Sequence, residues 1–544
     1  MLRWVAPASL AVAGIIHDLS GPPDQSSHFA YQILAAYTLL MAALQLPYAN
    51  SSKETGSWPQ YLTSLYYAVT EYFMPSSLRN LPAPDDDTPL LGQTITQFTA
   101  DNPSTRYLFL SRKFPRTPFI RFRVFFDAPV LLVTSLGAAK EVLLKECYAF
   151  KKPGWFFRGV AEISGVGLLF SEFDAHKAQR KLLQPCFSPP NLKKLLPVFR
   201  EKAAELGDYA DKLLGKDEKK VLEMYSLHTR ATLVVIGLTA LGMDLGSLEH
   251  ETRFQEIYDQ VFSPPGIGQL ITFINSWVPL RWMPIKANRD FISAMDELKD
   301  MLRQAIRRRK AEVANHKEGV LMTKDLIGYM LEQDGADVAF TEDVILGHML
   351  NIVGAGHETT ASTLTWGAYE LACRPDIQGE LRREIRMVLD SETGTSYADI
   401  DRIPKLDNFV KEVLRMYPSV PAHPREAARD VVISGVVVPK GTNVMICPAV
   451  LNQLPEVWGD DGREFRPSRW EGMDANSQLA LMTFFQGPRQ CIGKNFAILE
   501  MKAILCEMIS RFQFESPEGA PTYDNPSMFL RPRNGLRVVL RRLS

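Results

Sequence analysis

Residues 484–493 read FFQGPRQCIG, which matches the pattern FxxGxRxCxG at all five of its fixed positions. Gly487 and Gly493 let backbone N–H groups come close to the sulfur of Cys491. Apolar residues with helical spacing follow at once, from Lys494 to Ile509, so we expect a helix to begin beside the thiol. Because N–H donors and the positive end of a helix stabilise an anionic sulfur, this segment predicts a thiolate that ligates a metal.

The composition of the whole chain limits the alternatives. Its 544 residues include 46% apolar and 23% charged side chains, which are ordinary values for a globular protein. The 61 basic and 62 acidic residues give a formal charge of −1, which argues against a polybasic nucleic-acid binder. The six cysteines include no CxxC pair, and this excludes a zinc ribbon and a disulfide-stapled secreted scaffold.

The N-terminal region is apolar enough to enter a membrane. No acidic or basic residue occurs between Asp24 and Lys53, and the apolar stretch Phe29–Leu46 has 18 residues, close to the roughly 20 that a spanning helix needs. An earlier run, Trp4–Ile16, has 13 residues and is too short to span alone. We therefore expect residues 1–50 to form a membrane anchor of one or two hydrophobic segments, the alternative being a buried pair of amphipathic helices.

The loop between the two apolar runs indicates the orientation of this anchor. It carries Asp18 and Asp24 and no Lys or Arg, while Arg3 precedes the first run. This pattern favours a lumenal loop, with the bulk of the chain on the cytosolic side, as in the endoplasmic reticulum. Residues 51–84, which end in Leu-Pro-Ala-Pro, are expected to form a juxtamembrane hinge, and residues 85–544 a single large domain.

Helical periodicity dominates the remaining chain. Four long segments have apolar residues three and four positions apart: Leu192–Leu214, Val221–Leu241, Phe291–Lys317 and Thr341–Cys373. The strand-like segments are short: Phe119–Phe125, Val130–Val133, Val431–Val438 and Leu536–Leu540. The sequence therefore predicts a mainly α fold with a small β portion.

The cysteine loop resembles the haem-ligand loop of the cytochrome P450 family, in which the residue matching Cys491 is the axial thiolate of haem iron. The other matched positions would help to bind the cofactor: Phe484, Gly487, Arg489 and Gly493. Further motifs of the family occur in the expected order along the chain, from about Asn80 to the C-terminus. The resemblance implies the P450 fold, with haem b (iron protoporphyrin IX) between an oxygen-binding helix and the helix after the cysteine loop.

A second motif places opposite charges three residues apart on a helix, at Glu412 and Arg415, where the two side chains can meet. A further arginine, Arg469, stands in the segment FRPSRW, upstream of the cysteine loop. In the P450 family the matching three residues form a buried charge triad under the haem. Ser468 stands where many relatives have an acidic residue. We interpret the triad as structural.

The third motif, AGHETT at residues 355–360, lies in the middle of the long helical segment and resembles the oxygen-binding helix of the family. Cleavage of dioxygen needs protons delivered through a hydroxyl group and ordered water in an otherwise dry pocket. The resemblance assigns this relay to Glu358 and Thr359. The alternative is a pair of threonines on an ordinary buried helix. Helical geometry directs His357 away from that face, and it is not a candidate.

Haem propionates need cationic or hydrogen-bonding partners when they are buried. By resemblance, Arg489 and Arg425 match two such partners, and Arg180 matches a third. Many relatives have a tryptophan four residues before this last arginine, where the present chain has His176. A histidine and an arginine at this spacing can still face one propionate. The alternative for His176 is a histidine on the surface of an amphipathic helix.

Together these motifs imply a membrane-anchored monooxygenase that hydroxylates or otherwise oxidises a lipophilic small molecule with O2. Electrons would come from an NADPH-cytochrome P450 reductase, with or without cytochrome b5, because the chain shows no dinucleotide-binding fingerprint of its own. The pattern is similar to microsomal enzymes of filamentous fungi that act in secondary metabolism. The apolar segment Ile267–Met283 either dips into the bilayer and admits substrate or forms a buried connector.

Two other functions remain open from the sequence. The first is a haem-thiolate isomerase, dehydratase or peroxygenase that uses a peroxide, and the pair Glu358 and Thr359 weighs against it because such relatives can dispense with this pair. The second is a non-catalytic membrane protein that binds lipid or a partner, which would leave the loop around Cys491 unexplained.

Overall fold

The computed structural model describes residues 70–72, 74–264, 267–315, 325–332, 341–389, 399–400, 403–517, 519 and 521–543. The predicted anchor (residues 1–50) and most of the predicted hinge lie outside these residues, so both stay predictions. Among the described residues, no helix combines the length and the apolarity that crossing a bilayer requires.

The described chain forms two compact units. The smaller, which we call the β-rich unit, contains residues up to Ala100 together with Ser104–Lys151 and His423–Cys447. The larger, which we call the helical unit, contains Asp101–Pro103, Lys152–Ala422 and Pro448–Ser544. The predicted single domain is thus spread over both units, and its boundaries stay a prediction.

The β-rich unit is built around one sheet of five strands in the order β1-β2-β8-β5-β3. The strands are β1 (Phe119–Arg123), β2 (Pro129–Val133), β3 (Phe150–Lys151), β5 (His423–Ala427) and β8 (Asn443–Ile446). All neighbours are antiparallel except β2 and β8, which run parallel. The short helices of this unit are α4 (Ser76–Arg79), α5 (Thr94–Phe98), α6 (Thr105–Lys113) and α7 (Leu136–Lys140).

A hairpin of the β-rich unit corrects one sequence prediction. Val431–Val438, expected as one strand, is two: β6 (Val431–Ile433) pairs antiparallel with β7 (Val436–Val438). Ser434 and Gly435 both have positive φ angles, +48° and +79°. Two successive residues in the left-handed region make a tight turn of the kind that connects hairpin strands.

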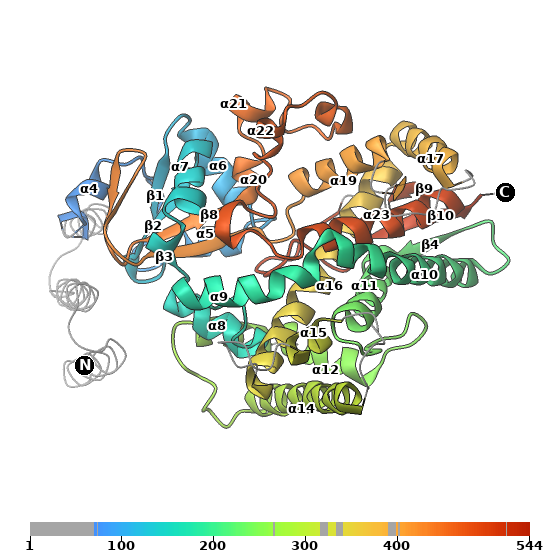
Figure 1. The fold of residues 1–544 in the computed structure, drawn as a ribbon. Helices are drawn as coiled ribbons and strands as arrows, with labels where there is room; N and C mark the ends of the chain where they lie inside the picture. Colours follow the sequence, from blue (N-terminus) through green and yellow to red (C-terminus); the bar gives the residue numbers. More distant parts are fainter. Residues whose placement is uncertain are drawn as a thin grey trace, which may run out of the picture. The chain divides into compact units, whose positions relative to one another are not determined.

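The helical unit contains the long helices (Figure 1). Its first half comprises α8 (Gly154–Ser164), α9 (Phe173–Leu183), α10 (Pro189–Leu214), α11 (Met224–Ala240), α12 (Arg253–Phe262), α13 (Ile267–Asn275), α14 (Lys286–Asn315) and α15 (Leu326–Glu332). Its second half comprises α16 (Glu342–Cys373), α17 (Pro375–Leu389), α19 (Pro404–Met416), α20 (Pro448–Leu451), α21 (Pro455–Trp458), α22 (Ala475–Gln478) and α23 (Lys494–Arg511). The mainly α fold class is confirmed.

Helix α16 is the centre of this unit. It has 32 residues, which corresponds to about 48 Å, and most of its side chains are buried all round. Thr341 caps its first turn by accepting a hydrogen bond from the N–H of Val344. Helix α11 packs along α16, and α10 packs along α23. The predicted segment Thr341–Cys373 is therefore confirmed as a helix.

A three-stranded sheet of order β4-β10-β9 completes the helical unit, with β4 (Lys219–Glu223), β9 (Phe512–Pro517) and β10 (Arg537–Arg542). It corrects the predicted helix Val221–Leu241, whose first residues belong to β4. The helix begins at Met224 because the carboxylate of Glu223 accepts the N–H groups of Tyr225 and Ser226 as an N-cap.

Candidate active site

The cysteine loop folds back on itself immediately before α23. The N–H of Cys491 donates to the carbonyl of Phe484 at 2.9 Å, and that of Gln490 donates to the carbonyl of Gly487 at 3.0 Å. Gly487 has φ +79°, a left-handed conformation that favours glycine. The loop therefore brings together Phe484, Gly487 and Cys491, as the local motif predicts.

The sulfur of Cys491 lies in an electropositive environment. Burial raises the pKa of the Cys491 thiol, while the N–H of Gly493 and the charges of Arg180 and Lys494 lower it. Burial has the larger effect, so the pKa of the Cys491 thiol is raised on balance. Lys494 begins α23, so the positive helix end faces the loop. These donors and charges suit a thiolate metal ligand, and they fit the sulfur end of a haem site.

Helix α9 and the segment before it lie against the cysteine loop. Arg180 Nη1 donates to the carbonyl of Gln490 at 2.5 Å. Arg489 Nη1 donates to the carbonyl of Ser171 at 3.1 Å, and the same guanidinium forms an ion pair with Glu172. The tertiary structure thus brings Arg180 and Glu172 to the cysteine loop, which carries Arg489, from about 310 residues earlier in the sequence. Glu172, which the sequence analysis missed, is the acidic partner of Arg489.

The two remaining predicted propionate partners have different positions. His176 of α9 is only 3% exposed, so the alternative of a surface histidine is wrong. Arg425 is buried in β5 of the β-rich unit, where its Nη1 donates to the carbonyl of Pro424 at 2.9 Å. The helical unit alone therefore does not bring Arg425 to the cysteine loop, and the roles of both residues toward haem stay predictions.

The three predicted triad residues meet in the core of the helical unit. Arg415 donates two hydrogen bonds of 2.8 Å to the two carboxylate oxygens of Glu412. Arg469 Nε donates to Oε1 of the same carboxylate at 2.9 Å. The indole N–H of Trp470 and the backbone N–H of Arg466 donate to it as well. Glu412 and Arg415 are 0% exposed, so this charge cluster is enclosed and fully hydrogen-bonded.

The middle of α16 is accessible along one face. Ala355 is exposed and Thr359, one turn later, is half-buried, whereas most neighbouring residues of the helix are buried. The hydroxyl of Thr359 donates to the carbonyl of Ala355 at 2.7 Å. The carbonyl of Thr359 accepts hydroxyl hydrogen bonds from Ser419 and Thr363, each at 2.9 Å. Thr359 is thus held in place at the accessible face of the helix.

Glu358 lies on the neighbouring, buried face of α16. Burial raises the pKa of Glu358 to about 7, against the positive charge of Arg531 and with the negative charge of Asp259 adding to the increase. A carboxyl group with this pKa exchanges its proton near neutral pH. His357, which the sequence analysis set aside, is buried, and its ring centroid lies 4.5 Å from that of Tyr258.

Sequence reasoning missed Arg531, Tyr258 and Asp259. One signal was available for Arg531: it is a lone charge in the apolar segment MFLRP, residues 528–532. No local pattern distinguished Tyr258 or Asp259, because both lie on α12, which is an ordinary amphipathic helix.

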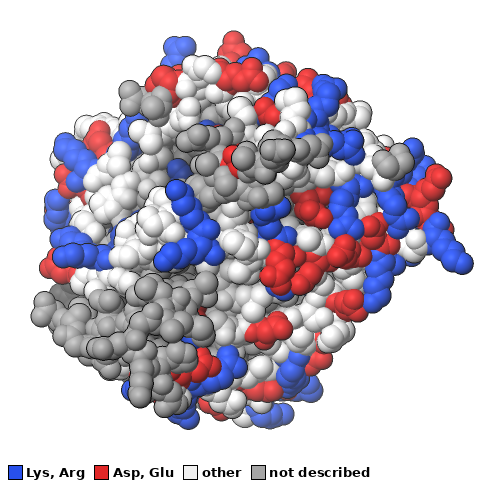
Figure 2. Space-filling model, turned by 45° about the vertical axis from the view of Figure 1, so that its right-hand side comes forward, with Lys and Arg blue, Asp and Glu red and all other residues white. Residues whose placement is uncertain are grey.

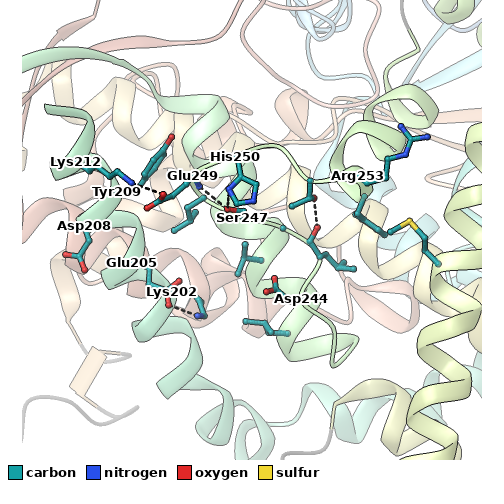
Figure 3. A pocket seen from close by; sticks show the side chains of 18 residues that line it. Lys202, Glu205, Asp208, Tyr209, Lys212, Asp244, Ser247, Glu249, His250 and Arg253 are labelled. Carbon is teal, nitrogen blue, oxygen red and sulfur yellow. Dashed lines mark hydrogen bonds and ion pairs between the residues drawn. The ribbon is translucent and has the colours of Figure 1, made fainter. Parts of the chain in front are cut away.

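A separate surface cavity of about 820 Å³ is lined by α10, α11 and the segment 244–254. Figure 3 shows two ion pairs among its lining residues, Lys202 with Glu205 and Lys212 with Glu249. None of the predicted site residues lines this cavity.

Comparison with known proteins identifies the family. Residues 82–540 match the family model of cytochrome P450. The chain is 32% identical to the cytochrome P450 monooxygenase sphH of Aspergillus fumigatus, over 84% of this chain and 87% of that protein. It is 31% identical to the cytochrome P450 monooxygenase FSL4 of Gibberella zeae, over 90% of this chain and 92% of that protein. The chain therefore belongs to the cytochrome P450 family and is a haem-thiolate monooxygenase.

Proposed function

We propose that this enzyme is anchored in a membrane and oxidises a lipophilic small molecule in fungal secondary metabolism, with electrons from an NADPH-cytochrome P450 reductase. The observation that carries the catalytic part of this proposal is the electropositive surroundings of the Cys491 sulfur, formed by Gly493, Arg180 and the start of α23. Bound haem supplies the iron and the redox chemistry with dioxygen.

The chain's own residues orient this chemistry and supply protons. The Gly493 N–H and the positive end of α23 stabilise negative charge on sulfur and so tune its donor strength. The hydroxyl of Thr359, on the accessible face of α16, can hold a water molecule and pass on a proton. Glu358, with its pKa of about 7, can give up a proton and recover it at neutral pH.

A membrane location is supported by the segment around α13. Ile267 is 64% exposed, Leu270 55% and Trp282 76%. An apolar cluster of this kind can enter the interfacial region of a bilayer, with Trp at the level of the headgroups. The predicted anchor of residues 1–50 would supply the main attachment. The charge pattern around it favours the endoplasmic reticulum, with the catalytic domain on the cytosolic side.

Exposed lysines close to the cysteine loop support the docking of an electron donor with an acidic surface. Lys181 at the end of α9 and Lys193 and Lys194 at the start of α10 are exposed. Phe187, between these two helices, packs against Phe496 of α23 with ring centroids 6.4 Å apart. A flavoprotein reductase or cytochrome b5 with acidic surface residues would be attracted to this surface.

The carbon monoxide spectrum of the ferrous protein tests the catalytic proposal. We expect the native protein to show the band of a thiolate-ligated haem, and Cys491→Ser to lose it. Cys373→Ser, which changes an exposed cysteine at the end of α16, is the control and should keep the band. Product formation with a hydroperoxide, and none with reductase, NADPH and O2, would instead identify the peroxide-dependent alternative.

A further inference from the structure

The C-terminal segment around residue 530 is hydrogen-bonded to α16 near Glu358 and Thr359. The carbonyl of Leu530 accepts hydrogen bonds from Ser362 Oγ at 2.5 Å and from the indole N–H of Trp366 at 2.9 Å. Ser362 is four residues after Glu358, so both lie on the same face of the helix. The next residue of the segment, Arg531, is therefore held next to the helix face that carries Glu358.

A second set of hydrogen bonds links the same segment to Thr359 through Ser419. The N–H of Leu530 donates to the carbonyl of Ser419 at 2.7 Å, and Ser419 Oγ donates to the carbonyl of Thr359 at 2.9 Å. The segment thus contacts α16 directly at Ser362 and Trp366, after the pair, and is linked to Thr359 through Ser419. Its position relative to these two residues is consequently well defined.

The guanidinium of Arg531 has two anchors of its own. Its Nε donates to Asp524 Oδ2 at 2.8 Å, and its Nη1 donates to Ser263 Oγ at 2.9 Å. Ser263 is the residue that ends α12. The side chain of Arg531 is 19% exposed, so its charge is poorly screened by water. A planar group held at two of its nitrogens has a fixed orientation.

Helix α12 encloses the other side of the cluster. Gly354 of α16 allows a close approach, since a Cβ there would lie 2.8 Å from the ring of Phe262. The ring of Tyr258 contacts that of His357, with centroids 4.5 Å apart. Asp259, the next residue of α12, is exposed and contributes negative charge to the cluster. The contact between α12 and α16 thus brings Glu358 among polar groups.

The charged and titratable groups around Glu358 come from four parts of the chain. They are Tyr225 of α11, Tyr258 and Asp259 of α12, His357 of α16, and Asp524 and Arg531 of the C-terminal segment. The imidazole of His357 is neutral, because burial lowers its pKa to about 4. Among these groups Arg531 carries the positive charge, and it opposes the effects of burial and of Asp259 on Glu358.

We propose that Arg531 is a positioning residue of the proton relay: anchored at Asp524 and at Ser263 of the α12 end, its guanidinium keeps a positive charge near the Glu358 carboxyl group and so keeps that group able to ionise. This proposal rests on the proposed role of Glu358 in proton delivery. Without the guanidinium, the carboxyl group would stay protonated to higher pH. It would then receive protons as before but release them toward Thr359 less readily.

Difference infrared spectroscopy of the holoenzyme tests the proposal directly. The carbonyl band of protonated Glu358 is identified as the band that Glu358→Gln removes, and its intensity is followed against pH. In Arg531→Gln we expect the midpoint to rise, by about one pH unit, because the positive charge that lowers the Glu358 pKa would be gone. The matched control is Arg533→Gln, an exposed arginine two residues later, which should leave the midpoint unchanged.

A kinetic readout accompanies the spectroscopic one. The fraction of NADPH electrons recovered in product should fall in Arg531→Gln, and its pH profile should shift in the same direction as the infrared midpoint. If Arg531→Gln does not fold, Arg531→Lys takes its place. Lys keeps the positive charge but lacks the planar guanidinium that bonds Asp524 and Ser263 together, so we expect a smaller rise of the midpoint and a partial loss of coupling.

An unchanged midpoint in a folded variant with normal haem content would overturn the proposal, as would an equal shift in Arg533→Gln. Failure of the proposed function is distinguishable. Normal coupling of Glu358→Gln would remove Glu358 from the relay, whereas the infrared midpoint would still report whether Arg531 controls the Glu358 carboxyl group.

Discussion

At the scale of single residues, Glu358 shows how far an enclosed site can change a side chain. The residue is 4% exposed, and burial raises the pKa of its carboxyl group to about 7 from the ordinary 4.5. The folded state therefore binds the Glu358 proton more tightly than the unfolded state. By linkage, the stability that this proton contributes is present below about pH 4.5 and is lost as the pH rises to about 7.

We therefore expect Glu358→Gln to become progressively more favourable for stability, relative to the native protein, between pH 5 and pH 8. The pH-dependent part of the difference should reach at most about 3 kcal/mol, from 1.36 kcal/mol per pH unit. Denaturant unfolding of both proteins at several pH values measures it. A difference that is independent of pH would contradict the raised pKa of Glu358.

Thr359 is the second residue whose role can be isolated. Its hydroxyl is half-buried on the accessible face of α16, where proton transfer is proposed. Thr359→Ala should leave the carbon monoxide spectrum intact but release peroxide, because electrons would be consumed without product. The adjacent Thr360→Ala, whose hydroxyl donates to Gly356 within the helix, should stay coupled. Tight coupling in Thr359→Ala would exclude the relay through this hydroxyl.

At the scale of elements, the cluster around Glu412 ties α19 to the segment before the cysteine loop. One carboxylate accepts hydrogen bonds from Arg415, Arg469, Trp470 and the backbone of Arg466. Loss of the Glu412 charge should therefore destabilise the fold more than loss of one ordinary contact, because two buried guanidinium groups would remain without their partner.

We accordingly expect Glu412→Gln to lower the free energy of unfolding by about 3–5 kcal/mol. The matched control is Glu380→Gln, which removes an exposed charge that pairs with Lys405 and should change the free energy by less than about 1 kcal/mol. Chemical denaturation of the three proteins measures both effects. Equal, small effects in the two variants would show that the triad does not stabilise the fold.

At the scale of the whole molecule, acidic and basic side chains are interspersed over the face drawn in Figure 2, in agreement with the formal charge of −1. A general electrostatic attraction to lipid headgroups is therefore not expected. Membrane binding would have to come from apolar contacts: the predicted anchor and the exposed residues Ile267, Leu270 and Trp282.

We predict that the full chain floats with neutral lipid vesicles in a density gradient, and that a chain without residues 1–50 binds at least tenfold more weakly, about 1.4 kcal/mol. Replacing Leu270 and Trp282 by Ser in the shortened chain should abolish the remaining binding. Equal flotation of the full and shortened chains would remove residues 1–50 from the role of anchor.

The difference between local and distant information explains what could be predicted. The cysteine loop lies within ten residues, 484–493, and the first pair of the triad within four, 412–415. For such segments the spacing of side chains is set by local backbone geometry, and the matched family motifs lead to the same assignment. The helical content and the central helix Thr341–Cys373 likewise follow from periodicity, which is a local property.

The tertiary structure alone decided the surroundings of these residues. Arg531 reaches the cluster of Glu358 from 173 positions further along the chain, and Glu172 meets Arg489 from 317 positions earlier. No spacing rule connects such residues, because packing of several helices brings them together. The amino-acid sequence by itself determined which groups carry the chemistry; the packing of α12, α16 and the C-terminal segment determined their charge state, since burial and neighbouring charges exist only in the folded chain.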